Sequence, residues 1–93
     1  MIRSFADNDT EALYDGANPR RIPSDVRKRA RRKLDLLNAA RSLRDLDSPP
    51  GNHLEALHGD RKGQHSIRVN RQWRICFWFE AGDAYDVEIV DYH

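Results

Sequence analysis

The segment from residue 73 to residue 93 has the clearest pattern of hydrophobic and polar positions in the chain. It is rich in aromatic and β-branched residues, and Gly82 with Asp83 interrupts it, which is typical of a β-hairpin. Alternate residues of a strand share one face. Arg74 is therefore expected at the base of the hairpin, on the face opposite the core. The core face of this strand is predicted to carry Trp73, Ile75, Phe77 and Phe79.

Helical spacing of apolar residues predicts two helices before these strands. A short first helix can be capped by Asp7 or Asn8. A long second helix can be capped by Ser24 or Asp25 and is expected to end near residues 42–46. Its apolar stripe is predicted to contain Val26, Ala30, Leu34, Leu37 and Ala40, widened by Leu36, Ala39 and Leu43.

Shorter alternating segments complete the predicted sheet. Residues 1–5, 53–58 and 66–69 each have the pattern of a strand, and residues 70–72 form a tight turn into the hairpin. The predicted order is β-α-α-β-β-β-β, in which helices precede a meander of strands. We therefore predict one α+β domain over residues 1–93, with two N-terminal helices packed on a twisted, mainly antiparallel sheet.

Composition places the chain among small soluble proteins. A length of 93 residues suits one domain, and 39% hydrophobic with 33% charged residues indicates a charged globule rather than a disordered chain. We find no apolar run of membrane-spanning length and no signal peptide, so we expect a cytoplasmic protein without membrane contact. Cys76 is the single cysteine and is expected to be a buried small hydrophobe.

Charge is distributed unevenly, although the net charge is only +1. Eight of the 16 Lys and Arg residues fall between Arg20 and Lys33, and none follows Arg74. Basic clusters favour polyanions, but a solvated helix face is an equally good explanation. Four basic residues flank the apolar stripe of the long helix and are expected to face water: Arg27, Lys28, Arg31 and Arg32.

The chain ends on an acid, a phenol and an imidazole, Asp91, Tyr92 and His93. All three can handle protons. No metal-ligand spacing and no phosphate-binding glycine loop is found, so no metal or other cofactor is expected. These residues suit metal-free cleavage of RNA, in which the 2′-hydroxyl attacks its own phosphate. Arg74 would stabilise the developing charge, His93 would transfer a proton, and Tyr92 would stack on a base or position the phosphate.

Four motifs within residues 54–93 together resemble one known family. They are Gly-Asp-x-x-Gly, Ser-Ile-x-Val, Trp-Arg-Ile-x-Phe and the terminal Asp-Tyr-His. The chain resembles the HigB branch of the RelE/ParE toxins, which belong to bacterial type II toxin–antitoxin modules. The resemblance implies a compact, microbial-RNase-like α+β fold and an mRNA endoribonuclease that acts in the ribosomal A site. It also implies a partner, a HigA-like helix-turn-helix antitoxin. In the toxin–antitoxin complex only the antitoxin would contact operator DNA.

Three positions depart from the family pattern. Glu55 stands where relatives often have His, and His58 stands where they usually have Lys. Glu can act as a general base and His can carry a proton, so both are candidate catalytic residues. Trp78 stands where relatives often carry Arg. The resemblance places the other catalytic candidates around the scissile phosphate: Arg74, Asp91, Tyr92 and His93.

Two alternative functions stay open at this point. One is a ParE-like gyrase poison, against which the terminal Asp-Tyr-His argues, because a gyrase inhibitor needs no proton-transfer group there. The other is a catalytically weakened module that binds RNA or an antitoxin, which the three departures favour. Candidate RNA-binding residues are the basic residues of the 59–63 loop, the following strand and the long helix: Arg61, Lys62, Arg68, Arg27, Lys28, Arg31 and Arg32.

Overall fold

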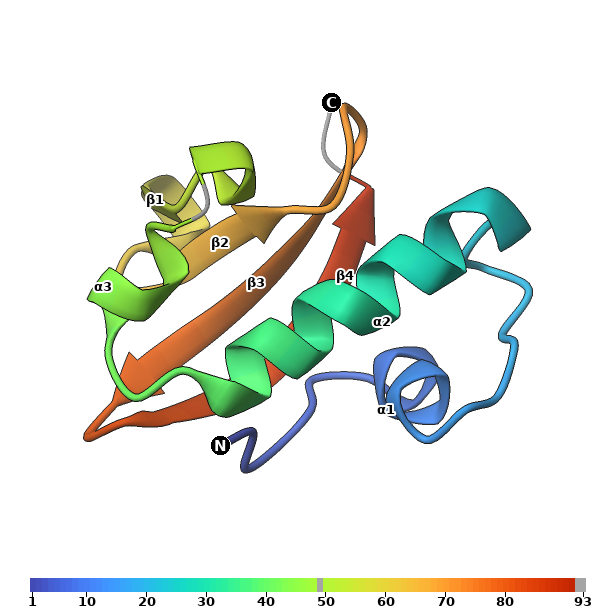
Figure 1. Ribbon diagram of the computed structural model, residues 1–93, viewed down its shortest axis with the longest axis horizontal. Coiled ribbons are helices and arrows are strands. Elements are labelled where there is room, and N and C mark those ends of the chain that lie inside the picture. Colours follow the sequence, from blue (N-terminus) through green and yellow to red (C-terminus); the bar gives the residue numbers. More distant parts are fainter. Residues whose placement is uncertain (49, 92–93) are drawn as a thin grey trace.

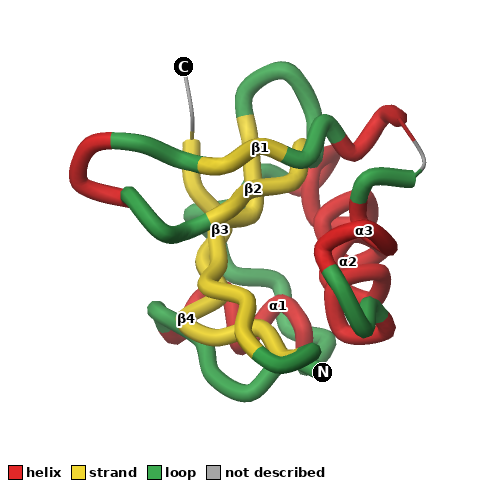
Figure 2. The backbone as a smooth tube through the Cα atoms, turned by 90° about the vertical axis from the view of Figure 1, so that its left-hand side faces the viewer, coloured by secondary structure: helices red, strands yellow, loops and turns green. Residues whose placement is uncertain are grey.

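A four-stranded antiparallel sheet with helices packed against it forms the fold (Figure 1). The computed structural model describes residues 1–48 and 50–91. Neighbouring strands follow the order β1-β2-β3-β4, and α2 and α3 lie on one side of the sheet (Figure 2). The predicted α+β class is confirmed. The elements are α1 (Asn8–Tyr14), α2 (Ser24–Ala39), α3 (Leu43–Leu46), β1 (Glu55–Ala56), β2 (His65–Arg68), β3 (Trp73–Glu80) and β4 (Asp83–Asp91), with short 3-10 turns at Pro50–Asn52 and Gly59–Arg61.

The predicted hairpin is the longest pairing in the sheet. β3 and β4 pair from Trp73 opposite Asp91 to Glu80 opposite Asp83. The two turn residues, Ala81 and Gly82, have φ angles of 50° and 83°. Two consecutive positive φ angles are the mark of a type I′ turn, whose twist matches that of the strands it joins. The hairpin therefore carries the start of β3 and the end of β4 to the same edge of the fold.

The core lies between α2 and the inner face of the sheet. Buried residues of α2 recur with the predicted spacing, and Ile75 and Phe77 of β3 are fully buried. Leu36 is 41% exposed and Ala39 is exposed, so the prediction that they widen the stripe was wrong. The residues of α2 and its C-cap that enter the core are Val26, Ala30, Leu34, Leu37 and Ala40.

The N-terminal segment does not form the full strand expected over residues 1–5. It makes two isolated parallel bridges to β4, from Ile2 to Ala84 and from Phe5 to Val87. Between these bridges β4 bulges at Asp86, whose φ is 51°. A bulge interrupts a ladder of hydrogen bonds, which explains why the pairing is not continuous.

The first helix begins where the sequence predicts and holds β4 in place. The Thr10 amide donates to Asp7 Oδ1 at 2.7 Å, which caps α1. The Ile89 amide donates to Thr10 Oγ1 at 3.0 Å, and Arg21 Nη1 donates to the Ile89 carbonyl at 3.0 Å. Because these bonds lie just before Asp91, they position the end of β4.

Both ends of α2 differ from the prediction. Ser24 is the first helical residue, Pro23 precedes it, and no side chain caps the helix. The helix ends at Ala39 rather than near residues 42–46, and the short α3 follows it. The Asp45 carboxylate accepts a hydrogen bond from the Arg41 amide at 2.9 Å, and this bond competes with the helical bond that the amide would otherwise make.

No described helix is both long and apolar enough to cross a bilayer.

The strand expected over residues 53–58 is reduced to the two residues of β1. His53 has a φ of 44°, so the backbone turns before the strand can extend. After β1 the chain folds over the outer face of the sheet and returns to β2. Arg61 Nη1 lies 3.0 Å from Glu88 Oε1 of β4. Gly63, with a φ of 98°, lies directly against the Trp78 ring.

Gly63→Ala tests whether Trp78 holds this loop on the sheet. A methyl group at position 63 would lie 2.5 Å from Cζ3 of Trp78. Gly16 is the matched control, because its φ is 103° and no atom lies within 4 Å of the added methyl. We expect Gly63→Ala to lower the free energy of unfolding by about 1–3 kcal/mol more than Gly16→Ala, measured by denaturant unfolding. Equal losses in the two variants would show that the Trp78 contact does not constrain the loop.

Candidate functional site

Arg74 is buried on the outer face of the sheet, opposite the helices. Its residue is 8% exposed, and Nε donates to Ser66 Oγ at 2.8 Å. Nη2 donates to the His53 carbonyl at 2.6 Å and lies 3.9 Å from Glu55 Oε1. Nη1 donates to no group among residues 1–48 and 50–91. The guanidinium is thus held in one orientation, and its Nη1 makes no hydrogen bond within the described residues.

Arg68 adds a second positive charge beside Arg74. The two residues pair directly across β2 and β3, so their side chains share the outer face. Arg68 Nε donates to the Asn70 carbonyl at 3.0 Å. Glu55, which is 56% exposed, is the acidic side chain closest to Arg74 in the described ion pairs. Two cations opposed across a strand pair repel each other, so an anion bound between them is favoured.

Asp91 lies at the end of β4 on the same edge of the sheet. It pairs with Trp73 in register, one position from Arg74, and its Oδ2 accepts Gln72 Nε2 at 3.0 Å. The predicted catalytic residues Tyr92 and His93 lie outside the described residues. Among the described catalytic candidates, the structure therefore brings Glu55 to Arg74. Asp91 lies at the same end of the hairpin, but as the partner of Trp73 it shares the core face rather than the outer face.

The 57–64 loop carries three further candidates in different environments. His58 and Lys62 are exposed. Arg61 is half-buried, and it donates to Gln64 Oε1 at 3.2 Å as well as to Glu88. The ion pair with Glu88 offsets the charge of Arg61, so His58 and Lys62 are the more accessible groups of this loop.

The basic residues of α2 divide into two sets. Arg27 donates to the carbonyls of Ile22 at 2.8 Å and Pro19 at 3.1 Å. Arg31 donates to the carbonyls of Leu13 at 3.0 Å and Ala17 at 2.6 Å.

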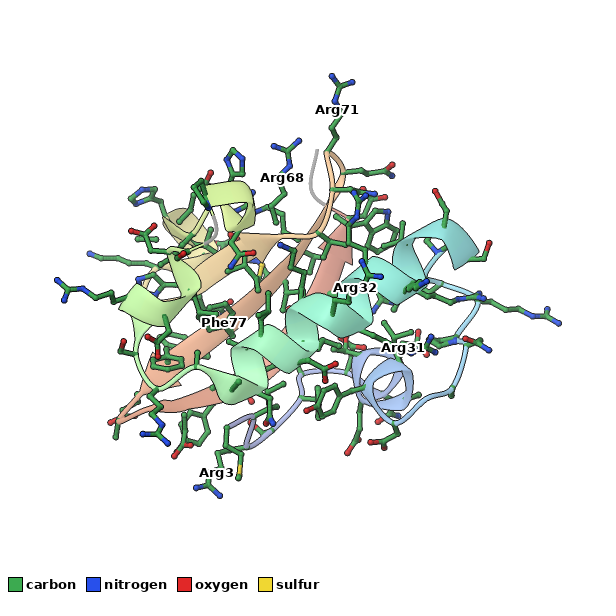
Figure 3. All side chains as sticks on the ribbon, viewed as in Figure 1. Arg3, Arg31, Arg32, Arg68, Arg71 and Phe77 are labelled. Atoms are coloured by element: carbon green, nitrogen blue, oxygen red, sulfur yellow. The ribbon has the colours of Figure 1, made fainter. Side chains whose placement is uncertain are left out.

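The prediction that Arg27 and Arg31 face water was wrong, because the loop joining α1 to α2 runs beside them and needs donors for its carbonyls. Lys28 and Arg32 are exposed as predicted. All four belong to α2, which packs on the core face of the sheet, whereas Arg74 lies on the outer face. Figure 3 labels Arg31 and Arg32 on this helix.

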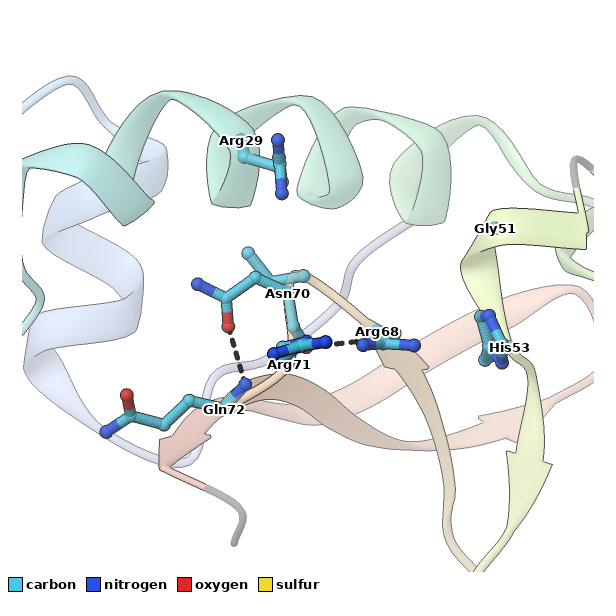
Figure 4. A pocket seen from close by; sticks show the side chains of 8 residues that line it. Arg29, Gly51, His53, Arg68, Asn70, Arg71 and Gln72 are labelled. Atoms are coloured by element: carbon cyan, nitrogen blue, oxygen red, sulfur yellow. Dashed lines mark hydrogen bonds between the residues drawn. The ribbon is translucent and has the colours of Figure 1, made fainter.

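A groove between α2 and the turn at 68–72 contains residues that the sequence analysis missed. It consists of two adjoining cavities of about 560 and 360 Å³, which share Arg29 (Figure 4). We call it the cationic groove, after Arg29, Arg32, Lys33, Arg68 and Arg71. The spacing of Arg29, Arg32, Lys33 and Leu36 is i, i+3, i+4, i+7, so a second helical stripe was the available signal.

No three His, Cys, Asp or Glu side chains gather closely enough to bind a metal ion in the part of the chain that the structure describes. Cys76 is fully buried as predicted, and burial raises the pKa of its thiol.

Comparison with known proteins identifies the family. The family model described as the RelE-like toxin of the type II toxin–antitoxin system HigB matches residues 3–93. The chain belongs to the HigB family of RelE-like toxins. It is similar to "Toxin HigB-1" of Vibrio cholerae, with 44% identity over 85 residues that cover 90% of each chain. It is also similar to "Endoribonuclease HigB" of Proteus vulgaris, with 33% identity over 93 residues that cover all of both chains.

Membership in a type II toxin–antitoxin family implies that this toxin has an antitoxin partner. Three of the four motifs from which the sequence analysis inferred the HigB family lie in the parts of the fold described above, and the fourth begins with Asp91 at the end of β4. The Trp-Arg-Ile motif starts β3 and supplies Arg74, and the Ser-Ile motif in β2 supplies the Ser66 hydroxyl that accepts from Arg74.

Arg74→Ala should lower stability, although Arg74 faces away from the core. The substitution leaves Ser66 Oγ and the His53 carbonyl without their donor, which typically costs about 1–3 kcal/mol. Arg71→Ala is the control, since Arg71 is exposed and its side chain contacts no described partner. Denaturant unfolding of both variants measures the difference. Equal midpoints for the two variants would contradict the contacts assigned to Arg74.

Proposed function

We propose that this toxin is an endoribonuclease that cleaves mRNA in the ribosomal A site and thereby inhibits translation. The observation that carries the proposal is the fixed Arg74 guanidinium, whose Nη1 makes no described hydrogen bond, one position from the residue that pairs with Asp91 of the terminal Asp-Tyr-His. The relative from Proteus vulgaris bears the name endoribonuclease, which supports the same chemistry.

Arg74 has the role of stabilising the transition state. When the 2′-hydroxyl attacks the adjacent phosphate, negative charge grows on the phosphoryl oxygens. A donor already oriented by Ser66 and His53 loses little entropy when it binds those oxygens. Arg68 supplies a second positive charge beside it. This step uses charge and hydrogen bonds alone and needs no cofactor.

Glu55 and His58 are the candidates for the base that takes the 2′-hydroxyl proton. Glu55 lies 3.9 Å from Arg74, so a base there acts next to the phosphate that Arg74 binds. His58 is exposed at the start of the loop that follows β1. A carboxylate and an imidazole are both residue types that act as general bases.

His93 is the candidate general acid for the leaving 5′-oxygen. His93 follows Asp91 by two residues in the sequence, and Asp91 pairs with the residue before Arg74, which supports this role. An imidazole titrates near neutral pH, which suits a group that must give and take protons there. Tyr92 would stack on a base or position the phosphate.

Exposed cations would hold the toxin on the ribosome. Lys28 and Arg32 of α2 make no described side-chain contact, so they are available for ribosomal RNA phosphates. Lys62 is available to the substrate strand in the same way, whereas Arg61 would act only together with Glu88. Arg27 and Arg31 have no such role in this account, because their donors bind the α1–α2 loop.

The proposed partners follow from the family. A HigA-like helix-turn-helix antitoxin would bind the toxin in the cytoplasm, and the complex would contact operator DNA only through the antitoxin.

One observation favours the alternative of a catalytically weakened binding module. Only 10% of the Arg74 side chain is exposed, so a substrate phosphate has limited access to it.

Primer extension on mRNA from cells that express the toxin tests the ribonuclease proposal. We expect new 5′ ends within translated codons for the native chain and their loss for His93→Gln. His93→Gln removes the proton-transfer group and replaces it with an uncharged side chain of similar size, so we expect the melting temperature to stay the same. Full cleavage by His93→Gln would move the proton-transfer role to His58. Absence of cleavage by the native chain would exclude the endoribonuclease and leave the binding module or a gyrase poison.

A further inference from the structure

The cationic groove has positive side chains on both of its walls. Arg29, Arg32 and Lys33 come from α2, Arg68 is the last residue of β2, and Arg71 comes from the turn that joins β2 to β3. Figure 4 shows Arg29 extending from the helix toward Asn70 and Arg71. No Asp or Glu lines either cavity. The groove therefore concentrates positive charge without an internal counter-charge.

These charges are not neutralised elsewhere in the described structure. Arg29, Arg32 and Arg71 form no ion pair or side-chain hydrogen bond within residues 1–48 and 50–91. Arg27 and Arg31, on the same helix, have their donors occupied by loop carbonyls. On α2, therefore, Arg27 and Arg31 bind the loop that joins α1 to α2, whereas Arg29 and Arg32 make no described side-chain contact and remain available to a ligand.

Lys33 experiences the repulsion within the groove. Its pKa is lowered by burial and then by the charge of Arg29. Lys33 Nζ donates to Asn52 Oδ1, and Asn52 Nδ2 in turn donates to the Leu46 carbonyl. An anion in the groove would relieve the repulsion between Lys33 and Arg29.

The groove begins at the candidate catalytic edge. Gln72 lines the groove and donates through Nε2 to Asp91 Oδ2 at 3.0 Å. His53 also lines it, and the His53 carbonyl accepts from Arg74. Because Arg74 lies on the outer face and α2 on the opposite side of the sheet, an RNA strand whose phosphate lies at Arg74 would pass over this edge, beside His53 and residues 68–72, to reach the positive charges of α2.

We propose that the cationic groove binds the sugar–phosphate backbone of the single-stranded RNA that adjoins the cleaved nucleotide. This inference rests on the proposed ribonuclease function, and it assigns binding roles to Arg29 and Arg71. An acidic protein segment fits the groove less well, because protein interfaces depend on apolar or aromatic anchors. The groove offers one exposed large apolar side chain, Leu36, at the end far from Asp91.

Binding of a 12-nucleotide 2′-O-methyl RNA to the full chain tests the proposal. This probe cannot be cleaved, because its 2′-oxygens are blocked. The test variant is Arg29→Gln with Arg71→Gln. The control is Arg20→Gln with Arg44→Gln, which removes the same charge from exposed arginines outside the groove. Fluorescence anisotropy over a salt series gives the affinity, and thermal melting checks that all variants fold.

We expect the groove variant to bind the RNA at least about tenfold more weakly than the native chain. Its slope of log affinity against log salt should fall by about 1.4, because each lost phosphate contact to a single strand contributes about 0.7. The control variant should keep most of the affinity. Equal losses in the two variants would overturn the proposal, since they would reflect net charge alone.

Cleavage and peptide-binding measurements distinguish a failure of the groove proposal from a failure of the ribonuclease proposal. If the native chain cleaves mRNA while the groove variant binds and cleaves as well as the native chain, the groove proposal fails and the ribonuclease stands. If the native chain does not cleave but the groove variant loses RNA binding, the ribonuclease fails and the groove remains an RNA site. Tighter binding of a 12-residue polyglutamate peptide, lost only in the groove variant, would assign the groove to an acidic protein partner instead.

Discussion

The buried charge of Arg74 is the constraint on which the candidate site depends. The guanidinium of a residue that is only 8% exposed must be hydrogen-bonded, because an unpaired buried charge destabilises the fold by several kcal/mol. The Ser66 hydroxyl and the His53 carbonyl meet this need, and they tie β2 and the segment before β1 to β3. The same bonds fix the direction of the guanidinium, so the group that stabilises the fold is also oriented for a phosphate.

The helical layer uses arginine in two ways that sequence composition does not distinguish. Arg27 and Arg31 donate hydrogen bonds to backbone carbonyls beside the first two helices. These bonds offset the free energy needed to remove the two side chains partly from water. Arg29 and Arg32 lie on the neighbouring side of the helix with no described partner. A chain with a net charge of only +1 can therefore still present a strongly positive surface, because its acidic residues lie elsewhere.

Periodicity predicted the parts of the fold that depend on local pattern. The alternation in β3 and the helical spacing in α2 identified Ile75, Phe77 and Leu34 as core residues, and the motifs identified the family. The burial of Arg74 could not be read from the same pattern, because its partner Ser66 comes from another strand and His53 from a loop whose path depends on tertiary contacts. The groove was missed for a related reason, since Arg29 meets Arg71 only after the sheet and helix have packed.

The rate of a single round of mRNA cleavage on programmed ribosomes tests the central claim, that Arg74 stabilises the transition state, most directly. Arg74→Lys keeps a positive charge but loses the oriented pair of nitrogens. The account predicts a cleavage rate constant lower by about 10²–10³ at saturating ribosomes, with ribosome binding unchanged. An unchanged rate constant would contradict it, because Arg74 would then serve the fold alone.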